Sequence, residues 1–255
     1  MRRGLIATRH QAADAIAAGR VTVSGAPATK PARLVAPHEP VLVAGDQTGF
    51  VTRGGHKLDA ALARFPVVVA GRRAFDAGAA HGGFTDCLLQ RGAASVVAVD
   101  VGSGQLDLAL RQDPRVEVRE GVNVRHLAPA DVRPPVDLVV ADLSFISLSL
   151  VAVPLLAVAN DDVDLVLLVK PQFEVGRVEA SRGRGVIRDP DLWRQALERV
   201  DAAWRAAGAA MMDVMASPLR GARGNVEFLA HVRRGAPAHA TSSIAAAIGQ
   251  AAEPT

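Results

Sequence analysis

Short apolar runs alternate with amphipathic segments along most of the chain. Seven runs are rich enough in Val, Leu, Ile and Ala to predict buried strands, at Ala74–Gly78, Ser95–Asp100, Val116–Arg119, Val136–Leu143, Asp164–Lys170, Met211–Ala216 and Val226–Val232. Helices are predicted between them, at Phe84–Arg91, Gln105–Gln112, Ile146–Val158 and Leu192–Ala207. This alternation predicts an α/β fold with a doubly wound, mostly parallel sheet. No helix separates the last two runs, so we expect them to pair antiparallel at one edge.

The N-terminal residues follow a different pattern, which predicts a small separate domain. A helix is expected at Ala12–Ala18, ended by Gly19, followed by a short strand at Val21–Val23. Proline-spaced residues then lead to another apolar run at Val41–Ala44. We therefore expect a small domain at residues 1–46, a linker at 47–56, a main domain at 57–235, and a tail at 236–255 with one short helix, Ser243–Ala252.

The composition indicates a folded protein of a reducing compartment. The chain has 255 residues, of which 49% are hydrophobic and 22% are charged, enough to form a substantial core. Its single cysteine, Cys87, excludes an internal disulfide and any multi-cysteine metal site, and the histidines lack metal-ligand spacing. No secretion leader and no apolar run of membrane-spanning length are present. We therefore expect a cytoplasmic protein without a metal or a membrane partner.

Positive charge is concentrated at the N-terminus. Residues 1–57 hold eight Lys and Arg against three Asp and Glu, whereas the remainder holds 21 against 23. This excess predicts a nucleic-acid contact through basic side chains there, namely Arg2, Arg3, Arg9, Arg20, Lys30 and Arg53. Only three of the 29 basic residues are lysines, Lys30, Lys57 and Lys170. They merit attention because lysine can lose its proton and arginine cannot.

A glycine-rich turn and an acidic residue point to a nucleoside-type cofactor. The first strand of the main domain runs into DAGAAHGGF, residues 76–84, where glycines let the backbone approach a ligand closely. The second strand ends in Asp100, which is placed to accept the hydroxyls of a ribose. The turn lacks the G-x-G-x-x-G pattern, which argues against a nicotinamide dinucleotide. S-adenosylmethionine suits this pair of features, and the alternative is an ordinary turn with a helix-capping acid.

Four further residues predict a charge-balanced cluster at the same edge of the sheet. Asp142 and Lys170 end two buried strands, Lys57 precedes the sheet, and Glu227 begins the last run. A lysine at the end of a buried strand is costly unless it is paired or functional. If the four meet, like-charge proximity favours the neutral form of one lysine, which could act as a general base toward a hydroxyl. The alternative is two unrelated salt bridges.

Motifs along the whole chain resemble those of the TlyA family. They are TRGGHKL (52–58), FDAGAAHGGFTD (75–86), DVGSGQL (100–106), DLVVADLSFIS (137–147), LVKPQFEVG (168–176), GVIRDP (185–190) and SPLRGARGNVEF (217–228), with an S4-like segment around Arg9, Gly19, Val21 and Gly25. The resemblance implies an S4 RNA-binding domain joined to an FtsJ-like domain with a Rossmann-like class I methyltransferase sheet. Family members, often named haemolysin, transfer methyl from S-adenosylmethionine to the ribose 2′-hydroxyl of cytidines in 16S or 23S ribosomal RNA. The expected partners are therefore ribosomal RNA and ribosomal subunits, and the oligomeric state stays open.

The resemblance also implies roles for individual residues. A catalytic tetrad falls on Lys57, Asp142, Lys170 and Glu227. Cofactor contacts fall on Asp76, Gly78, Ala80, His81, Gly82, Gly83, Phe84, Asp100, Val101, Asn123 and Asp142. In this scheme Lys170 accepts the proton, Asp142 and Glu227 position it, and Lys57 helps to fix the hydroxyl.

Some residues depart from the family pattern. The chain starts at MRRGL, after the usual first S4 helix, so we expect that the natural start lies upstream or that the S4 domain is truncated. Ala80-His81 replaces the usual Ser-Thr, and Ser103 and Leu108 replace aromatics that would stack on adenine. These changes keep an alternative open, an RNA-binding protein with a degenerate, inactive methyltransferase domain. A pore-forming haemolysin and a dehydrogenase are less well supported, because the chain lacks a spanning or basic amphipathic helix and the dinucleotide fingerprint.

Overall fold

A computed structural model describes residues 9–36, 39–43, 49–176, 179, 185–221, 223–235 and 240–252. The chain divides into two compact units, Met1–Thr52 and Arg53–Thr255. Each unit has an apolar core of its own. The helices of the described residues include none with both the length and the apolarity needed to cross a bilayer.

The first unit packs one helix on a small antiparallel sheet. Helix α1 (Arg9–Ala17) precedes strands β1 (Val21–Val23), β2 (Ala26–Pro27) and β3 (Val41–Val43), which lie in the order β2-β1-β3. The predicted helix and the strand at Val21–Val23 are thus present. Among the described residues of this unit, the buried core consists of small apolar side chains, Ala15, Val21, Val23 and Ala28.

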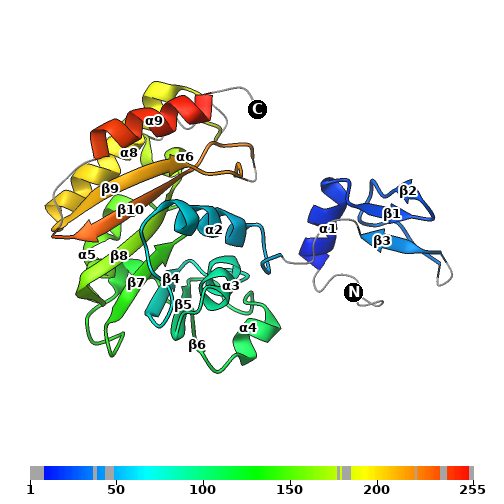
Figure 1. The fold of residues 1–255 in the computed structure, drawn as a ribbon, viewed down its shortest axis with the longest axis horizontal. Coiled ribbons are helices and arrows are strands. Elements are labelled where there is room, and N and C mark those ends of the chain that lie inside the picture. Colours follow the sequence, from blue (N-terminus) through cyan, green and yellow to red (C-terminus); the bar gives the residue numbers. More distant parts are fainter. Residues whose placement is uncertain are drawn as a thin grey trace. The chain divides into compact units, whose positions relative to one another are not determined.

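The second unit is built on a seven-stranded sheet (Figure 1). Its strands are β4 (Arg73–Ala77), β5 (Ser95–Asp100), β6 (Val116–Glu120), β7 (Val136–Ala141), β8 (Ala159–Val169), β9 (Ala209–Ala216) and β10 (Phe228–Arg234). They lie in the order β6-β5-β4-β7-β8-β10-β9. Strands β4 to β8 are parallel, and β10 runs antiparallel to both β8 and β9. The doubly wound sheet with an antiparallel edge pair is therefore confirmed, and the carboxyl ends of β4, β5, β7 and β8 share one edge.

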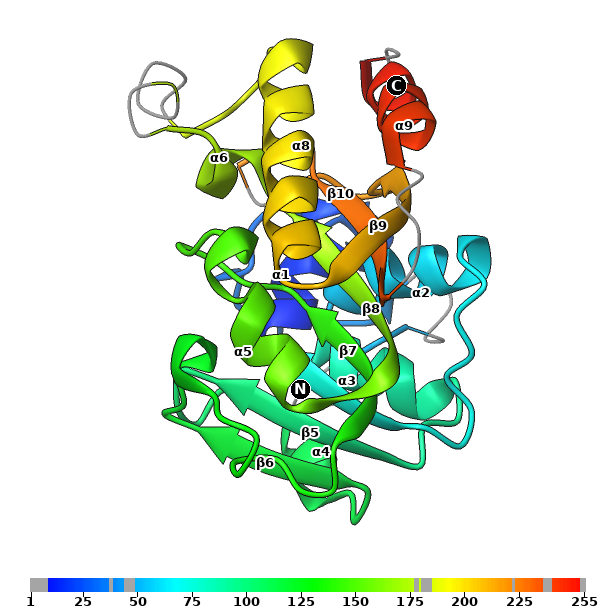
Figure 2. The ribbon, with the colours of Figure 1, turned by 90° about the vertical axis from the view of Figure 1, so that its left-hand side faces the viewer.

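Helices cover both faces of this sheet (Figure 2). The described residues of the second unit form the helical segments α2 (Gly54–Arg64), α3 (Gly83–Gln90), α4 (Leu108–Gln112), η1 (Val124–His126), η2 (Leu148–Leu150), α5 (Ala152–Ala157), α6 (Pro171–Glu174), α8 (Pro190–Ala206) and α9 (Ala240–Ala252). Helix α2 packs on α3, which lies against β4 and β5, while α8 packs on α5, α6, α9 and β9. The largest buried cluster lies between the sheet and the α5, α8 and α9 layer.

The helices differ from the sequence prediction most at α2, α5 and α9. Helix α2 begins at Gly54, inside the segment expected to be a linker, because Leu58, Ala61 and Leu62 form a buried stripe that extends the helix backward. The helix expected at residues 146–158 is divided into η2 and α5, with Pro154 in the first turn of α5, where its missing N–H costs nothing. The short helix expected at Ser243–Ala252 is present as α9 but begins at Ala240, and its Ile244, Ala247 and Ile248 enter the main core. Their i, i+3, i+4 spacing places them on one face of that helix.

Candidate active site

The turn after β4 brings the backbone of two strands into close contact. Gly78 has a φ of +87°, and a Cβ built there would lie 2.5 Å from the Asp142 carbonyl oxygen. The Asp142 N–H in turn donates to the Ala77 carbonyl at 3.0 Å. Only glycine fits a left-handed position this close to another main chain. The end of β4 is therefore locked against the first residue after β7.

Asp100 organises the rest of this turn. Its Oδ2 accepts the Ala80 N–H at 2.9 Å, and its Oδ1 accepts the Gly102 N–H at 2.7 Å. Ala80 has a φ of 45°, and the hydrogen bond from its N–H to Asp100 holds this left-handed conformation in place. The departure from the family at Ala80 is therefore accommodated within the turn. Each half-buried Asp100 oxygen still has a second lone-pair direction with which to accept a ribose hydroxyl.

Asp76, on β4, is a fully buried carboxyl with one oxygen unsatisfied. Thr85 Oγ1 donates to its Oδ2 at 2.6 Å, whereas Oδ1 has no hydrogen-bond partner. Burial raises the pKa of Asp76 to about 7, with the nearby Asp142 and Asp100 carboxylates adding to the shift and the Thr85 bond opposing it. A buried acceptor without a donor is costly, so this oxygen marks a place for a cationic or hydrogen-bonding ligand group.

The shifted pKa predicts a pH-dependent stability of the ligand-free protein. Asp76 loses its proton near pH 3.8 when unfolded and near pH 7 when folded. Unfolding therefore releases a proton in this interval, and the free energy of unfolding falls as the pH rises through it. Asp76→Asn keeps an acceptor for Thr85 and removes the titration. Urea unfolding at pH 5 and pH 8 should show the wild type losing roughly 2–3 kcal/mol more than the variant. If the wild type and Asp76→Asn lost the same free energy of unfolding between pH 5 and pH 8, the raised pKa of Asp76 would be contradicted.

The four charged residues predicted to cluster form two ion pairs. Lys170 Nζ lies 2.6 Å from Asp142 Oδ1, and Lys57 Nζ lies 2.5 Å from Glu227 Oε2. Lys170 and Glu227 are buried, and Lys57 and Asp142 are half-buried. Lys57 comes from α2 in the first turns of the unit, so that helix, expected in part as linker, supplies a member of the site.

The sheet register brings the two pairs side by side. Phe228 of β10 pairs with Val169 of β8 in antiparallel register. The next residues outward, Glu227 and Lys170, therefore face each other across the two strands. Gly221 leaves room for Glu227, because a Cβ at Gly221 would lie 2.5 Å from Glu227 Oε1. The two salt bridges are thus neighbours at one sheet edge.

Two aromatic rings and a hydroxyl beside Lys170 were missed in the sequence prediction. Ser144 Oγ lies 3.0 Å from Lys170 Nζ, and the Phe173 ring centroid lies 6.0 Å from the same atom. Phe145 packs on Phe173 with a centroid separation of 5.2 Å. Phe145 is 91% exposed and has a φ of 64°, an uncommon conformation for an aromatic residue. The only sequence signal was their position next to two strand-ending charged residues.

The other residues expected to contact a cofactor lie around the turn in different environments. Val101 is exposed beside Asp100, and His81 is exposed in the turn itself. Asn123 caps η1 by accepting the Arg125 N–H at 3.0 Å. The side chain of Phe84 is buried on α3, so only its backbone is placed to meet a ligand.

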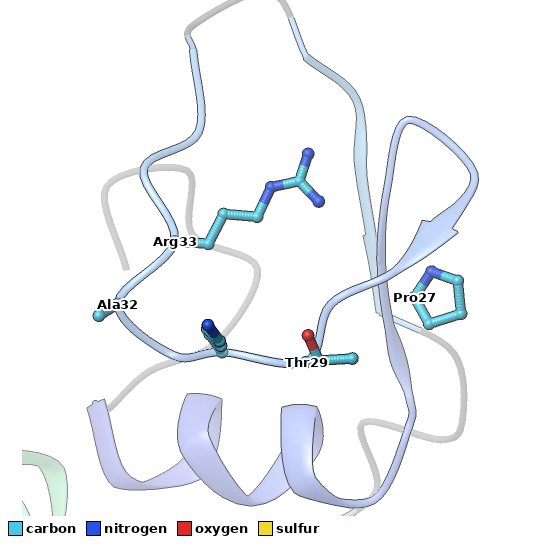
Figure 3. Close-up of a pocket in the computed structure, with 5 residues that line it drawn as sticks. Pro27, Thr29, Ala32 and Arg33 are labelled. Atoms are coloured by element: carbon cyan, nitrogen blue, oxygen red, sulfur yellow. The ribbon is translucent and has the colours of Figure 1, made fainter.

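The first unit contains a basic pocket. A cavity of about 330 Å³ lies along the loop after β2, lined by Pro27, Thr29, Lys30, Ala32 and Arg33 (Figure 3). Lys30 was predicted to contact nucleic acid, and the neighbouring Arg33, which also pairs with Glu39 at 3.2 Å, was missed. Arg20 is exposed in this unit, and Arg53 is exposed at the start of the second. Arg2, Arg3 and the side chain of Arg9 lie outside the described residues.

Comparison with known proteins matches both units. Residues 50–234 match the FtsJ-like methyltransferase family, and residues 2–41 match the S4 domain family. The 16S/23S rRNA (cytidine-2′-O)-methyltransferase TlyA of Mycobacterium tuberculosis is 50% identical over 234 residues, which cover 91% of this chain and 87% of that protein. Hemolysin A of Brachyspira hyodysenteriae is 36% identical over 229 residues, covering 89% of this chain and 95% of the relative.

Solved structures of other proteins also resemble this chain. A candidate hemolysin from Streptococcus thermophilus superposes with a TM-score of 0.81 at 38% identity, over 98% of this chain and 92% of that one. An S-adenosylmethionine-dependent methyltransferase from Mesorhizobium loti shares the fold alone, with a TM-score of 0.52 at 16% identity, over 70% of this chain and 98% of the other. The chain belongs to the TlyA family, FtsJ-like methyltransferases with an N-terminal S4 domain.

Proposed function

We propose that this chain transfers a methyl group from S-adenosylmethionine to the ribose 2′-hydroxyl of cytidine in ribosomal RNA, 16S, 23S or both. The observation that carries the proposal is the pair of adjacent lysine–carboxylate bridges beside the glycine turn. The 50% identity to the M. tuberculosis 16S/23S rRNA (cytidine-2′-O)-methyltransferase supports the substrate.

The residues around the turn fit S-adenosylmethionine. The unsatisfied Asp76 Oδ1 suits the cationic amino group of its methionine part, and the free lone pairs of Asp100 suit its ribose hydroxyls. Gly78 lets the turn pass close to the Asp142 main chain, where a side chain would clash. When bound, this cofactor supplies an electrophilic methyl group on a sulfonium sulfur. The protein's task is then to align the 2′-oxygen and to receive its proton.

Lys170 is the proton acceptor in the mechanism that we propose. Its amine accepts the 2′-hydroxyl proton as the oxygen attacks, and Asp142, 2.6 Å away, stabilises the resulting ammonium. Ser144 Oγ, 3.0 Å from Nζ, fixes the direction of the amine. Lys57 is paired with Glu227, the residue that faces Lys170 across the strand register, and helps to hold the 2′-oxygen. Proton transfer of this kind contributes about 100- to 10,000-fold to a rate.

Phe145 offers a stacking surface for the base of the target nucleotide. Exposed aromatic rings stack on unpaired bases, and here the ring rests on Phe173, whose own ring centroid lies 6.0 Å from Lys170 Nζ. Phe145→Ala should lower kcat/KM for RNA by roughly 5- to 100-fold, from about 1–3 kcal/mol of stacking. Because the ring is 91% exposed, the melting temperature and the affinity for the cofactor should stay unchanged. Methylation equal to that of the wild type would contradict this role.

The first unit supplies the RNA contact outside the catalytic centre. We assign residues 1–46 to RNA binding, through Arg20, Lys30 and the missed Arg33 among the described residues, and residues from α2 onward to catalysis. The expected partner is ribosomal RNA within a ribosomal subunit. Phosphate contacts of this kind weaken as the salt concentration rises.

The test is methyl transfer to purified ribosomal subunits. The protein is incubated with methyl-labelled S-adenosylmethionine and with 30S or 50S subunits from a strain that lacks the modification. Label mapped to a cytidine 2′-oxygen supports the proposal and identifies the subunit. An absence of label together with an absence of cofactor binding by calorimetry would favour an RNA-binding protein with an inactive methyltransferase domain.

A further inference from the structure

One buried carboxylate ties together the two segments that carry the proposed catalytic groups. Glu174 ends α6, four residues after Lys170, and its Oε2 accepts the Ser147 hydroxyl at 2.5 Å. Its Oε1 accepts the Leu148 N–H at 2.8 Å. Ser147 and Leu148 belong to the loop after β7, which begins with Asp142. Glu174 therefore connects the segment that follows Lys170 to the segment that follows Asp142.

We propose that Glu174 is a positioning residue for methyl transfer, which holds the loop of residues 142–148 in the conformation that places Ser144 beside Lys170 and Phe145 on Phe173. The inference rests on the function proposed above. Glu174 itself is 2% exposed, and both of its oxygens are engaged within the protein. Direct contact with RNA or cofactor is thus not its role.

The strained loop needs an anchor at each end. At its start, the Asp142 N–H is bonded to Ala77 of β4. At its far end, the Leu148 N–H is bonded to Glu174. Between these anchors Phe145 keeps a φ of 64°, which costs about 1–2 kcal/mol for a residue with a Cβ. Such a conformation persists only where the surroundings impose it, so loss of the Glu174 anchor lets the loop relax.

The backbone of Glu174 is also held in place, by a hydrogen bond from helix α8. Arg199 of α8 donates through Nη1 to the Glu174 carbonyl oxygen at 2.7 Å. Helix α8 packs on both α6 and η2, so the anchor is fixed to the body of the second unit. Phe173, the neighbour of Glu174 in α6, supports the Phe145 ring. A shift of α6 would therefore move the Phe173 ring and, with it, the Phe145 ring that packs on it.

The environment of Glu174 allows a neutral replacement. Burial raises the pKa of the Glu174 carboxyl, while the bonds from Ser147 and Leu148 oppose that shift. In Glu174→Gln, the amide oxygen can still accept the Leu148 N–H, and the amide N–H can donate to Ser147 Oγ. Alanine can do neither. Comparison of the two variants therefore separates the effect of losing the hydrogen bonds to Ser147 and Leu148 from the effect of losing the carboxylate charge.

The test compares Glu174→Ala and Glu174→Gln with a control variant, Asp164→Asn. Asp164 is a buried acid on β8, the strand that ends just before Lys170, and it is bonded to Arg72 at 2.7 Å and to His231 at 2.9 Å. It lies six residues before Lys170, roughly 20 Å along the strand. Ser147→Ala, which removes one of the two bonds to Glu174, is the milder variant if Glu174→Ala does not fold. For each protein, kcat and KM with the subunit substrate, cofactor affinity and backbone hydrogen exchange at Leu148 are measured.

We expect Glu174→Ala to lower kcat by about 10- to 100-fold, as a displacement of the order of 1 Å does. KM and cofactor affinity should stay within about threefold of the wild type, while the Leu148 amide exchanges faster. Glu174→Gln should restore most of kcat, Ser147→Ala should lower kcat partially, and Asp164→Asn should lose stability without losing kcat.

The positioning role is overturned by an unchanged kcat in Glu174→Ala, by equal loss in the alanine and glutamine variants, or by equal loss in Asp164→Asn. A wild-type protein that binds the cofactor but methylates neither subunit would instead contradict the proposed function. In that case faster exchange at Leu148 in Glu174→Ala would still support the anchor, and unchanged exchange would overturn it.

Discussion

Lys170→Ala and Lys170→Arg should both lose methyl transfer by at least about 100-fold, the lower range for a missing general base. Alanine removes the amine and leaves the half-buried Asp142 without its ion pair. Arginine can keep that ion pair, but its guanidinium stays protonated and cannot accept the 2′-hydroxyl proton. Both variants keep the glycine turn, Asp76 and Asp100, so cofactor binding should remain measurable. Single-turnover transfer of labelled methyl and calorimetric titration with S-adenosylmethionine measure the two effects separately.

Lys57→Arg is the matched variant for this experiment. Lys57 acts through its positive charge in the scheme above, and its pair with Glu227 can be kept by a guanidinium. We therefore expect Lys57→Arg to keep more activity than Lys170→Arg. Full activity in Lys170→Arg would remove the general-base role, and equal loss in both variants would show that the two lysines act as one unit rather than in separate roles.

Gly78→Ala should abolish cofactor binding, with a loss of affinity on the order of 100-fold or more. The new Cβ would lie 2.5 Å from the Asp142 carbonyl oxygen and 3.1 Å from the carbonyl carbon, and both atoms belong to the main chain. Neither can turn aside as a flexible side chain would. Relief of the clash must move the turn or the residue that pairs with Lys170, so methyl transfer is lost too. Calorimetric titration with S-adenosylmethionine measures the affinity directly.

Gly208→Ala is the control for backbone strain. Gly208 has a φ of +90°, similar to Gly78, but a Cβ there would meet no atom within 4 Å. It follows α8 at the turn into β9, far along the chain from the glycine turn. This variant should lose roughly 1–2 kcal/mol of stability, the cost of a left-handed alanine, and keep its cofactor affinity. If Gly78→Ala and Gly208→Ala bound the cofactor equally tightly, the close approach of Gly78 to Asp142 would not matter for cofactor binding.

Much of the fold could be predicted because the strand signal is local. Continuous apolar runs between helical segments identify buried parallel strands without knowledge of their neighbours, and all seven runs are strands in the structure. The bounds of helices were less predictable, since they depend on packing partners distant in the sequence. Helix α9 is an example: it was expected as a short helix within a tail, yet it begins at Ala240, and its Ile244 and Ile248 pack into the core.

The residues of the candidate site also fall into two groups: those that the sequence indicates and those that only the structure identifies. Asp142 and Lys170 stand out in the sequence because a charge at the end of a buried strand is costly without a partner. Glu174, Ser144 and Phe145 carry no such signal, because short polar and aromatic residues are common in loops. Their importance follows only from distances to groups up to 27 residues away, such as that between Glu174 Oε2 and Ser147 Oγ.

By itself, the sequence determined the class of sheet, the residues that end its strands and the four charged groups that meet at its edge. Those properties depend on hydrophobic pattern and residue type, which are local. The tertiary structure decided which lysine pairs with which carboxylate, since Lys57 meets Glu227 across 170 positions of the chain. It also decided that Glu174 anchors the strained loop at Phe145. Both choices depend on strand order and register, which only the packing of the whole second unit defines.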